Sequence, residues 1–334
     1  MNLIYLVTGG AGFLGGNIVS QLINRGDRVR VLALAGDKNI KKLPSEVEVI
    51  EGNVLIESDL DQFFQLSPDQ QAIVIHSAAI ITMSLTMEEK VRSVNVDGAR
   101  NVVKRCFDPQ IRKLIYISSV HAITEKPEDE IITEPEMTDP DAVVGCYAKT
   151  KAEACQMVMN QRNHHGLKVN IIFPSGISGP GDYASGNMTQ LFIDYFQGRI
   201  PMGVHGGYNF VDVRDVARGI LSVCDKDLIG EDFILAGQYI TVMEILRIFS
   251  EISGEKKLLF KAPSWLARLS LPLFSLWYRI RKQTPVFSAY SLLTVLTNSH
   301  FSSEKAKRDL GFYARPIEES IRDTARWLKD QKRI

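Results

Sequence analysis

The sequence of 334 residues has few cysteines and no excess of charge of either sign. Its four cysteines form no CxxC pair, and its six histidines form neither an HxxxH nor an HExxH motif. This spacing predicts no metal site, and it predicts reduced, mostly buried thiols in a cytoplasmic protein rather than disulfides. Lysine plus arginine and aspartate plus glutamate both number 39, so the chain has no net positive field that would hold a nucleic acid.

Long hydrophobic runs are also missing, although hydrophobic residues make up 45% of the chain. No run reaches the roughly 18 apolar residues that a membrane-spanning helix needs, so no transmembrane segment is predicted. The apolar run that ends at Thr8 has no basic stretch before it and is too short for a signal peptide, so it predicts a buried strand. The hydrophobic fraction excludes an intrinsically disordered chain.

Short apolar runs alternate with segments of helical period in the first half of the chain. Strands are predicted at 3–7, 29–34, 47–50, 72–75, 114–117 and 169–173, and helices at 14–24, 60–66, 87–106 and 147–163. Near-continuous apolar strands separated by helices indicate a parallel sheet covered on both faces. The sequence therefore predicts an α/β protein with a doubly wound, parallel-sheet Rossmann fold.

The pattern changes after Pro174. A Gly/Pro-rich stretch leads into a polar and aromatic segment, and further helices are predicted at 241–252, 265–280, 303–310 and 317–329. We interpret residues 1–175, together with about 210–236, as an NAD(P)-binding domain. We expect residues from about 176–209 and 237–334 to form a smaller, mainly helical substrate-binding region.

Glycines dominate the end of the first predicted strand, which reads Thr8-Gly9-Gly10-Ala11-Gly12-Phe13-Leu14-Gly15. Without Cβ atoms the backbone turns sharply and approaches a pyrophosphate closely, and the N-terminus of the following helix favours the anion. A G-x-G-x-x-G pattern alone is weak evidence, but its place between a strand and a helix indicates dinucleotide binding. The predicted contacts are Thr8, Gly9, Gly12, Phe13, Leu14 and Gly15.

The end of the second predicted strand bears on the choice between NAD and NADP. A carboxylate there binds the ribose 2′-hydroxyl of NAD, whereas a basic group accepts the 2′-phosphate of NADP. Residues 33–35 contain no acid, and Lys41 and Lys42 follow closely, either as phosphate ligands or as a solvated basic loop. The prediction leans slightly to NADP, with NAD as the alternative.

A serine, a tyrosine and a lysine form the candidate catalytic set. Tyr147 and Lys151 are four residues apart in a predicted helix and therefore share one face. A lysine ammonium beside a phenol is expected to lower the pKa of the tyrosine from about 10, which suits proton exchange with a carbonyl or hydroxyl oxygen. Ser119 follows the predicted strand 114–117 at the carboxyl edge of the sheet, where an open α/β sheet binds its ligand.

This order of motifs resembles that of the extended short-chain dehydrogenases/reductases (the NAD-dependent epimerase/dehydratase family), and the likeness covers almost the whole chain. Matching segments stand at 75–79, 95–101, 174–182 and 210–217. The resemblance implies that Tyr147 is the catalytic acid/base, that Lys151 holds the nicotinamide ribose, and that Ser119 polarises the substrate oxygen. It also implies a homodimer, and cofactor contacts from Asn53, Val54, Ser77, Ala78, Ala79, Asn95, Ile117, Tyr147, Lys151, Pro174, Gly176 and Ile177.

Two positions depart from patterns within this family. Asn53 stands where an aspartate usually lies near the adenine, which keeps a hydrogen-bonding amide but removes the charge. Gly176 and its neighbours replace the R-x-x-N-x-Y-G-P segment of nucleotide-sugar epimerases and dehydratases, so both polar side chains of that segment are missing. The stretch 206–213 and the ending 309–328 resemble bacterial proteins similar to dihydroflavonol reductase.

The resemblance therefore favours an NAD(P)-dependent oxidoreductase that reduces a ketone or oxidises a secondary alcohol on a small, fairly apolar substrate. The alternatives are a nucleotide-sugar epimerase, dehydratase or reductase, and a non-catalytic dinucleotide-binding regulator, which has no chemical reason to keep the serine, tyrosine and lysine together. The substrate wall is expected from residues 80–90, 121–145 and 184–208 and from part of the C-terminal helices. The apolar stretch 265–281 is expected to be buried against a second domain or subunit, with a membrane surface or a substrate lid as alternatives.

Overall fold

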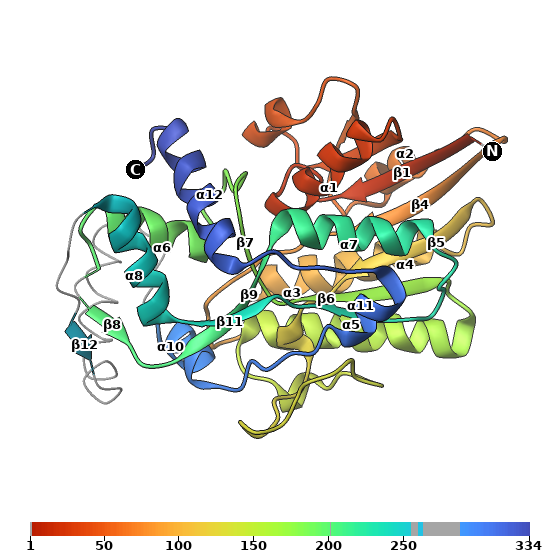
Figure 1. Cartoon of the computed structure of the whole chain (residues 1–334). Coiled ribbons are helices and arrows are strands. Elements are labelled where there is room, and N and C mark those ends of the chain that lie inside the picture. Colours follow the sequence, from red (N-terminus) through yellow and green to blue (C-terminus); the bar gives the residue numbers. More distant parts are fainter. Residues whose placement is uncertain (1, 201, 255–259, 263–287) are drawn as a thin grey trace.

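The computed structural model describes residues 2–200, 202–254, 260–262 and 288–334. Its centre is a sheet of seven parallel strands in the order β10-β6-β5-β4-β1-β2-β3, with helices on both faces (Figure 1). The strands are β1 (Asn2–Thr8), β2 (Arg28–Ala33), β3 (Glu48–Glu51), β4 (Gln70–His76), β5 (Ile111–Ile117), β6 (Val169–Pro174) and β10 (Phe233–Leu235). The strand order reverses between β1 and β4, which confirms the predicted doubly wound Rossmann fold.

All six predicted strands are present, and five of them are apolar runs that the sheet buries, whereas β3 at the edge of the sheet is only partly buried. The seventh strand, β10, has no separate signal in the sequence, since it contains three residues. Phe233, Ile234 and Leu235 are completely buried beside β6. Tertiary packing, and not local pattern, makes this segment a strand.

Helices cover both faces of the sheet with separate buried clusters. Leu22 and Ile220 share one cluster with Val31, and Val102 and Val158 share the other with further sheet residues. The first face carries α1 (Phe13–Asn24) and α7 (Val213–Asp225), and the second carries α2 (Glu57–Phe63), α3 (Glu89–Arg92), α4 (Ala99–Arg105) and α5 (Cys146–His165).

The single helix predicted at 87–106 is interrupted. A π-helical turn at Ser93–Gly98 separates α3 from α4. Such turns are rare and often lie at functional sites. Here the turn carries Asn95, which is 2% exposed and forms hydrogen bonds across to the segment that follows β4.

The second part of the chain is mixed and not only helical. It contains a three-stranded sheet and a two-stranded one, and its helices enclose a third buried cluster that includes Phe192, Ile245 and Ile321. Its strands are β7 (Gly176–Ser178), β8 (Met202–Val204), β9 (Gly207–Asp212), β11 (Gln238–Thr241) and β12 (Phe260–Ala262), and its helices are α6 (Asn187–Phe196), α8 (Val242–Ser253), α10 (Ala289–Leu296), α11 (Glu304–Leu310) and α12 (Ile317–Asp330). The helix predicted at 265–280 lies outside the described residues.

A buried ion pair joins the segment before α12 to the first turn of α7. Arg315 Nε and Nη2 donate to Asp215 at 3.0 and 2.9 Å, and the backbone N–H of Arg315 donates to the same carboxylate at 2.8 Å. The Asp215 side chain is 1% exposed. Burial opposes its charge, but the bonds and charge of Arg315 outweigh burial and hold the pKa of Asp215 below its ordinary value.

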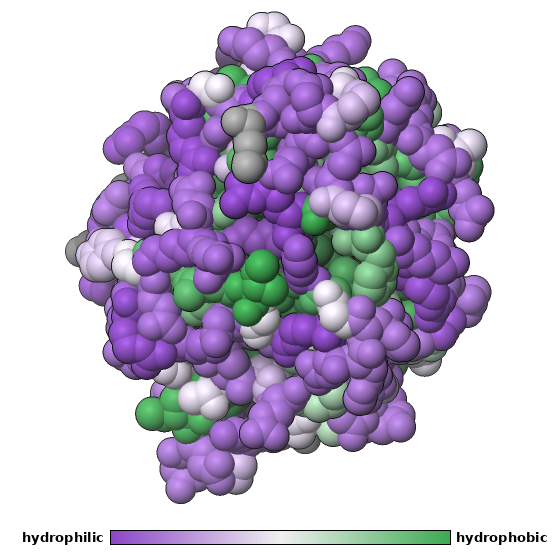
Figure 2. Space-filling model, turned by 90° about the vertical axis from the view of Figure 1, so that its right-hand side faces the viewer, coloured by the Kyte–Doolittle hydropathy of each residue, from purple (hydrophilic) through white to green (hydrophobic). Residues whose placement is uncertain are grey.

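The face shown in Figure 2, on the side where the N-terminus lies in Figure 1, is mainly hydrophilic with a small apolar patch. No helix within the described ranges has the length and apolar character needed to cross a membrane. All four cysteines are buried and free, as the sequence predicts for reduced thiols.

Candidate active site

The glycine turn between β1 and α1 leaves no room for side chains. Gly9 has φ +71°, and a Cβ atom there would lie 2.8 Å from the Ala78 backbone. A Cβ atom on Gly15 would lie 2.2 Å from the Gly9 carbonyl oxygen, so α1 packs directly against the turn. The first turn of α1 therefore presents its free N–H groups beside an open space, which fits a dinucleotide pyrophosphate.

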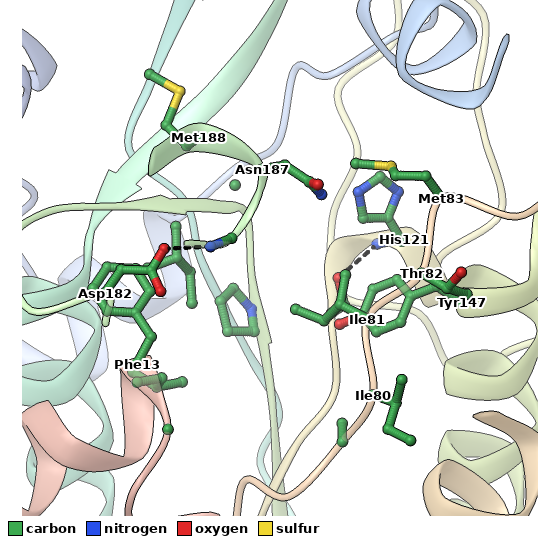
Figure 3. Close-up of a pocket in the computed structure, with 18 of the residues that line it drawn as sticks. Phe13, Ile80, Ile81, Thr82, Met83, His121, Tyr147, Asp182, Asn187 and Met188 are labelled. Atoms are coloured by element: carbon green, nitrogen blue, oxygen red, sulfur yellow. Dashed lines mark hydrogen bonds between the residues drawn. The ribbon is translucent and has the colours of Figure 1, made fainter. Parts of the chain in front are cut away.

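A cavity of about 950 Å³ runs along the carboxyl edge of the sheet from this turn into the second part of the chain. Figure 3 shows Phe13 and Asp182 on one side of it and Tyr147 and His121 on the other. The predicted site residues that line it are Gly9, Gly12, Phe13, Leu14, Gly15, Asn53, Val54, Ser77, Ala78, Ala79, Ile117, Ser119, Tyr147, Lys151, Pro174, Gly176 and Ile177.

Thr8 and Asn95 were predicted as cofactor contacts, but neither is among the residues lining the cavity. Thr8 is completely buried, and its Oγ1 lies 2.7 Å from Nδ1 of His76. Asn95 accepts a hydrogen bond from the backbone N–H of Ile80 at 2.8 Å and donates to the Ile80 carbonyl at 3.0 Å. The geometry therefore makes both of them supports for segments that line the cavity.

The adenosine end of the cavity differs from the prediction in its charge. Lys41 and Lys42 are exposed and do not belong to the cavity lining, and Lys42 Nζ instead lies 5.1 Å from the centre of the Tyr183 ring. Asp37 does line the cavity, although it lies beyond the strand tip. Glu51 reaches the same loop, where it accepts a hydrogen bond from the Gly36 N–H at 3.0 Å. The carboxylate of Asp37, and not the two lysines, lines this end.

Ser119, Tyr147 and Lys151 all line the cavity, and the side chains of Ser119 and Tyr147 form a hydrogen bond. Ser119 follows β5 and accepts a hydrogen bond from the His121 N–H at 3.2 Å. Tyr147 lies in the first turn of α5, and Lys151 follows one turn later. Lys151 Nζ donates to the Ile117 carbonyl at 2.6 Å, which fixes the helix to the end of β5.

The structure does not support the expected lowering of the Tyr147 pKa by Lys151. Burial raises the pKa of Tyr147 to about 12, and a hydrogen bond with Ser119 only partly opposes it. Burial also lowers the pKa of Lys151 to about 8. The ammonium of Lys151 donates to a backbone carbonyl, so burial is the main influence on the pKa of Tyr147. Tyr147 is therefore a neutral proton donor.

Beyond Tyr147 the cavity wall becomes apolar. Ile81 and Met83 come from the predicted segment 80–90, and Met188, Leu191, Ile200 and Val204 come from 184–208. Part of the C-terminal helices was also expected to contribute, and residues 240–246, at the predicted helix 241–252, and residues 290–295, where no helix was predicted, complete the wall. Phe192, Tyr195 and Phe196 pack into the core of the second part instead of lining the cavity.

Comparison with known proteins identifies a family to which this chain is related. Residues 6–197 match the model of the 3-beta hydroxysteroid dehydrogenase/isomerase family. Over 98% of its length the chain is 26% identical to sterol demethylase protein B of Methylococcus capsulatus (99% of that protein) and 27% identical to a putative dihydroflavonol 4-reductase of Synechocystis (94% of that protein). The crystal structure of gox2253 superposes with a TM-score of 0.84 at 27% identity, covering all of both chains.

Proposed function

The chain belongs to the 3-beta hydroxysteroid dehydrogenase/isomerase family and is an NAD(P)-dependent oxidoreductase of the extended short-chain dehydrogenase/reductase type, and we propose that it interconverts a ketone and a secondary alcohol on an apolar substrate. One observation carries this proposal. The cavity that begins at the glycine turn passes Ser119, Tyr147 and Lys151 and then continues between apolar walls. A dinucleotide and an apolar substrate can therefore meet at the phenol.

Each of the three polar residues has a separate task in this proposal. The nicotinamide, when bound, supplies or accepts the hydride. Tyr147 donates a proton to the carbonyl oxygen during reduction, and Ser119 orients that oxygen by a hydrogen bond. In the reverse direction, the phenolate that this donation leaves is the form that takes the proton of the alcohol. Lys151 holds the nicotinamide ribose, from its fixed position at the end of β5. Residues 1–175 and about 210–236 are assigned to the cofactor, and about 176–209 and 237–334 to the substrate.

The residues at the adenosine end favour NAD, which reverses the slight preference for NADP. Asp37 lines this part of the cavity, and one of its oxygens accepts the Asn39 N–H at 2.9 Å. A carboxylate accepts hydrogen bonds from ribose hydroxyls but repels a 2′-phosphate. Lys41 and Lys42 lie outside the lining and do not neutralise that phosphate.

A steady-state assay tests the reaction and the cofactor choice together. We expect ketone-dependent oxidation of NADH with aromatic, alicyclic or 3-oxosteroid ketones, and a kcat/KM for NADH at least about tenfold above that for NADPH. Asp37→Ala should reduce the ratio of kcat/KM for NADH to that for NADPH, whereas Asp27→Ala, which removes a carboxylate from the opposite end of β2, should leave it unchanged. Absence of turnover with every ketone contradicts the reaction, and a preference for NADPH contradicts the cofactor assignment alone.

Nucleotide-sugar chemistry receives less support from the same cavity. A Cβ atom on Gly176 would lie 2.8 Å from the Phe210 ring, so the ring occupies the space that an amide side chain would need. Arg199 lines the cavity, but its guanidinium is already paired with the buried carboxylate of Asp194 at 2.6 Å. Neither group is arranged to bind a sugar diphosphate.

The pH dependence of the reaction follows from Lys151. Since burial lowers its pKa to about 8, the ammonium is present below that pH and is lost above it, while Tyr147 stays protonated up to about 12. We expect kcat/KM for NADH in ketone reduction to be level from about pH 6 to 7.5 and to fall above about pH 8. A profile that stays level to about pH 10 contradicts this assignment. Lys151→Arg should move the fall to higher pH, because a guanidinium keeps its proton.

A further inference from the structure

The mainly apolar wall of the cavity contains a cluster of three polar side chains that contact one another and that the proposed reaction does not use. His121, Tyr208 and Tyr290 all line the cavity. The Tyr208 hydroxyl lies 3.1 Å from Nε2 of His121, and the Tyr290 hydroxyl lies 3.3 Å from Nδ1. The centre of the His121 ring is 6.1 Å from that of Tyr147, with the rings edge to face. The three side chains therefore form one hydrogen-bonded group beside the phenol, which we call the His121 group.

All members of the His121 group are uncharged at neutral pH. Burial lowers the pKa of His121 to about 4 and raises the pKa of Tyr208 and of Tyr290. A neutral imidazole has one N–H, and each phenol has one O–H, so the group holds three such protons. Its two hydrogen bonds use two of them. One hydroxyl proton is left over for a partner outside the group, in a wall that is mainly apolar but also presents Asn187, Ser291 and Thr294.

The position of the leftover proton depends on the imidazole tautomer. If Nδ1 carries the proton, it donates to the Tyr290 oxygen, Tyr208 donates to Nε2, and the Tyr290 O–H is free to donate. If Nε2 carries the proton, Tyr290 donates to Nδ1, and its oxygen, which Thr294 also reaches with a hydrogen bond, has one lone pair left to accept. Tyr290 can thus bind either a carbonyl or a hydroxyl oxygen at the same place, with His121 adjusting to it.

The backbone fixes Tyr290 relative to Tyr147. Gly145 precedes α5 with φ 98°, and a Cβ atom there would lie 2.4 Å from the Tyr290 ring. The ring therefore rests on the backbone two residues before Tyr147. Ser288 and Ser291 close a capping box at the start of α10, which holds the helix end that carries Tyr290.

We infer that Tyr290, supported by His121, binds a second oxygen of the substrate. This inference rests on the proposed function and makes it more specific. The preferred substrate has an apolar skeleton with two oxygens, one placed at Tyr147 for reaction and one held at Tyr290. Since the second oxygen is bound as either carbonyl or hydroxyl, its oxidation state matters little. Tyr290 is a specificity-determining residue, and His121 is a positioning residue that acts through it.

Matched pairs of ketones test this inference with the full-length protein and NADH. The pairs are cyclohexanone with hydroxycyclohexanone, decalone with hydroxydecalone, and a saturated steroid ketone with its ring-hydroxylated analogue. We expect the wild type to prefer the hydroxylated member of at least one pair by about tenfold in kcat/KM. Tyr290→Phe, which keeps the ring on Gly145, should remove that preference by raising KM for the hydroxyketone while KM for the plain ketone stays within about twofold.

Control variants separate recognition from structure. Tyr313→Phe removes the same hydroxyl from a side chain that is 65% exposed, and it should leave the preference intact. His121→Phe should lose the preference as Tyr290→Phe does. If Tyr290→Phe lowered kcat/KM equally for both ketones of a pair, the role of Tyr290 would be merely structural. If the wild type showed no preference for the hydroxylated ketone in any pair, the inference would be overturned. Failure of the wild type to reduce any of the six ketones contradicts the proposed function itself.

Discussion

Replacement of Tyr147 by phenylalanine is expected to lower kcat about 10³-fold while the dissociation constant of the cofactor stays within about twofold. The hydroxyl is the proton donor in the proposed reaction, and burial keeps it protonated by raising its pKa to about 12. Phenylalanine retains the ring that packs edge to face with His121. The loss therefore falls on the chemical step, and it should be measured as single-turnover NADH oxidation with a saturating ketone, beside a fluorescence titration of NADH.

Two comparisons make this expectation specific. Tyr183→Phe alters an exposed tyrosine on the loop between β7 and α6 and should keep kcat within about twofold, because it removes no proton donor from the reacting centre. Ser119→Ala should reduce kcat less than Tyr147→Phe does, since the phenol remains to transfer the proton. Undiminished turnover in Tyr147→Phe would remove this residue from the proposed mechanism, whatever the cofactor affinity.

Replacement of Arg315 by methionine is expected to lower the free energy of unfolding by about 3 kcal/mol. The substitution leaves the Asp215 carboxylate buried at 1% exposure without its two-pronged partner, while Arg218, half exposed, still reaches it at 2.9 Å. A buried charge that loses a partner costs more than the ion pair contributes, and the half-exposed Arg218 offsets only part of that cost. Urea unfolding at pH 7 measures the change.

The matched control is Arg326→Met, which removes an arginine from an ion pair with Asp323 on the surface of α12. Arg326 is 74% exposed, so its loss should change the free energy of unfolding by no more than about 0.5 kcal/mol. Adding Asp215→Asn to Arg315→Met should recover part of the lost stability, because the stranded charge disappears. A double variant that is less stable than Arg315→Met would contradict the electrostatic explanation.

The parts of the fold that depend on short stretches of sequence could be predicted. The apolar runs of β1, β2 and β4 to β6 are buried on both faces, and such runs have few other structures available. The glycine turn is also local, since Gly9 needs its positive φ and Gly15 its close approach within seven residues of chain. The three-residue strands β7, β8, β10 and β12 have no such signal, because each is extended only through its neighbours in a sheet.

The sequence motifs of the candidate site were predictable. The charge at its adenosine end and the residues of its substrate wall were not. Spacing alone puts Lys41 near the end of β2, but only the folded loop shows that Asp37 lines the cavity in its place. His121 and Tyr290 are separated by 169 residues, and nothing in either neighbourhood indicates that they meet. The sequence places an ammonium one helical turn from Tyr147, which predicts a lowered pKa, but it does not show the burial that raises this pKa.

Asn95 sets a limit on how this cavity can be redesigned. Its one amide satisfies both backbone groups of Ile80, and its Nδ2 also reaches Thr150, the neighbour of Lys151, at 3.0 Å. Aspartate offers no donor and leucine offers neither group, so each would release the 80–83 wall and loosen α5 together. Engineers who wish to change which molecules enter can vary Ile81 and Met83 freely in size, provided that this amide anchor is left in place.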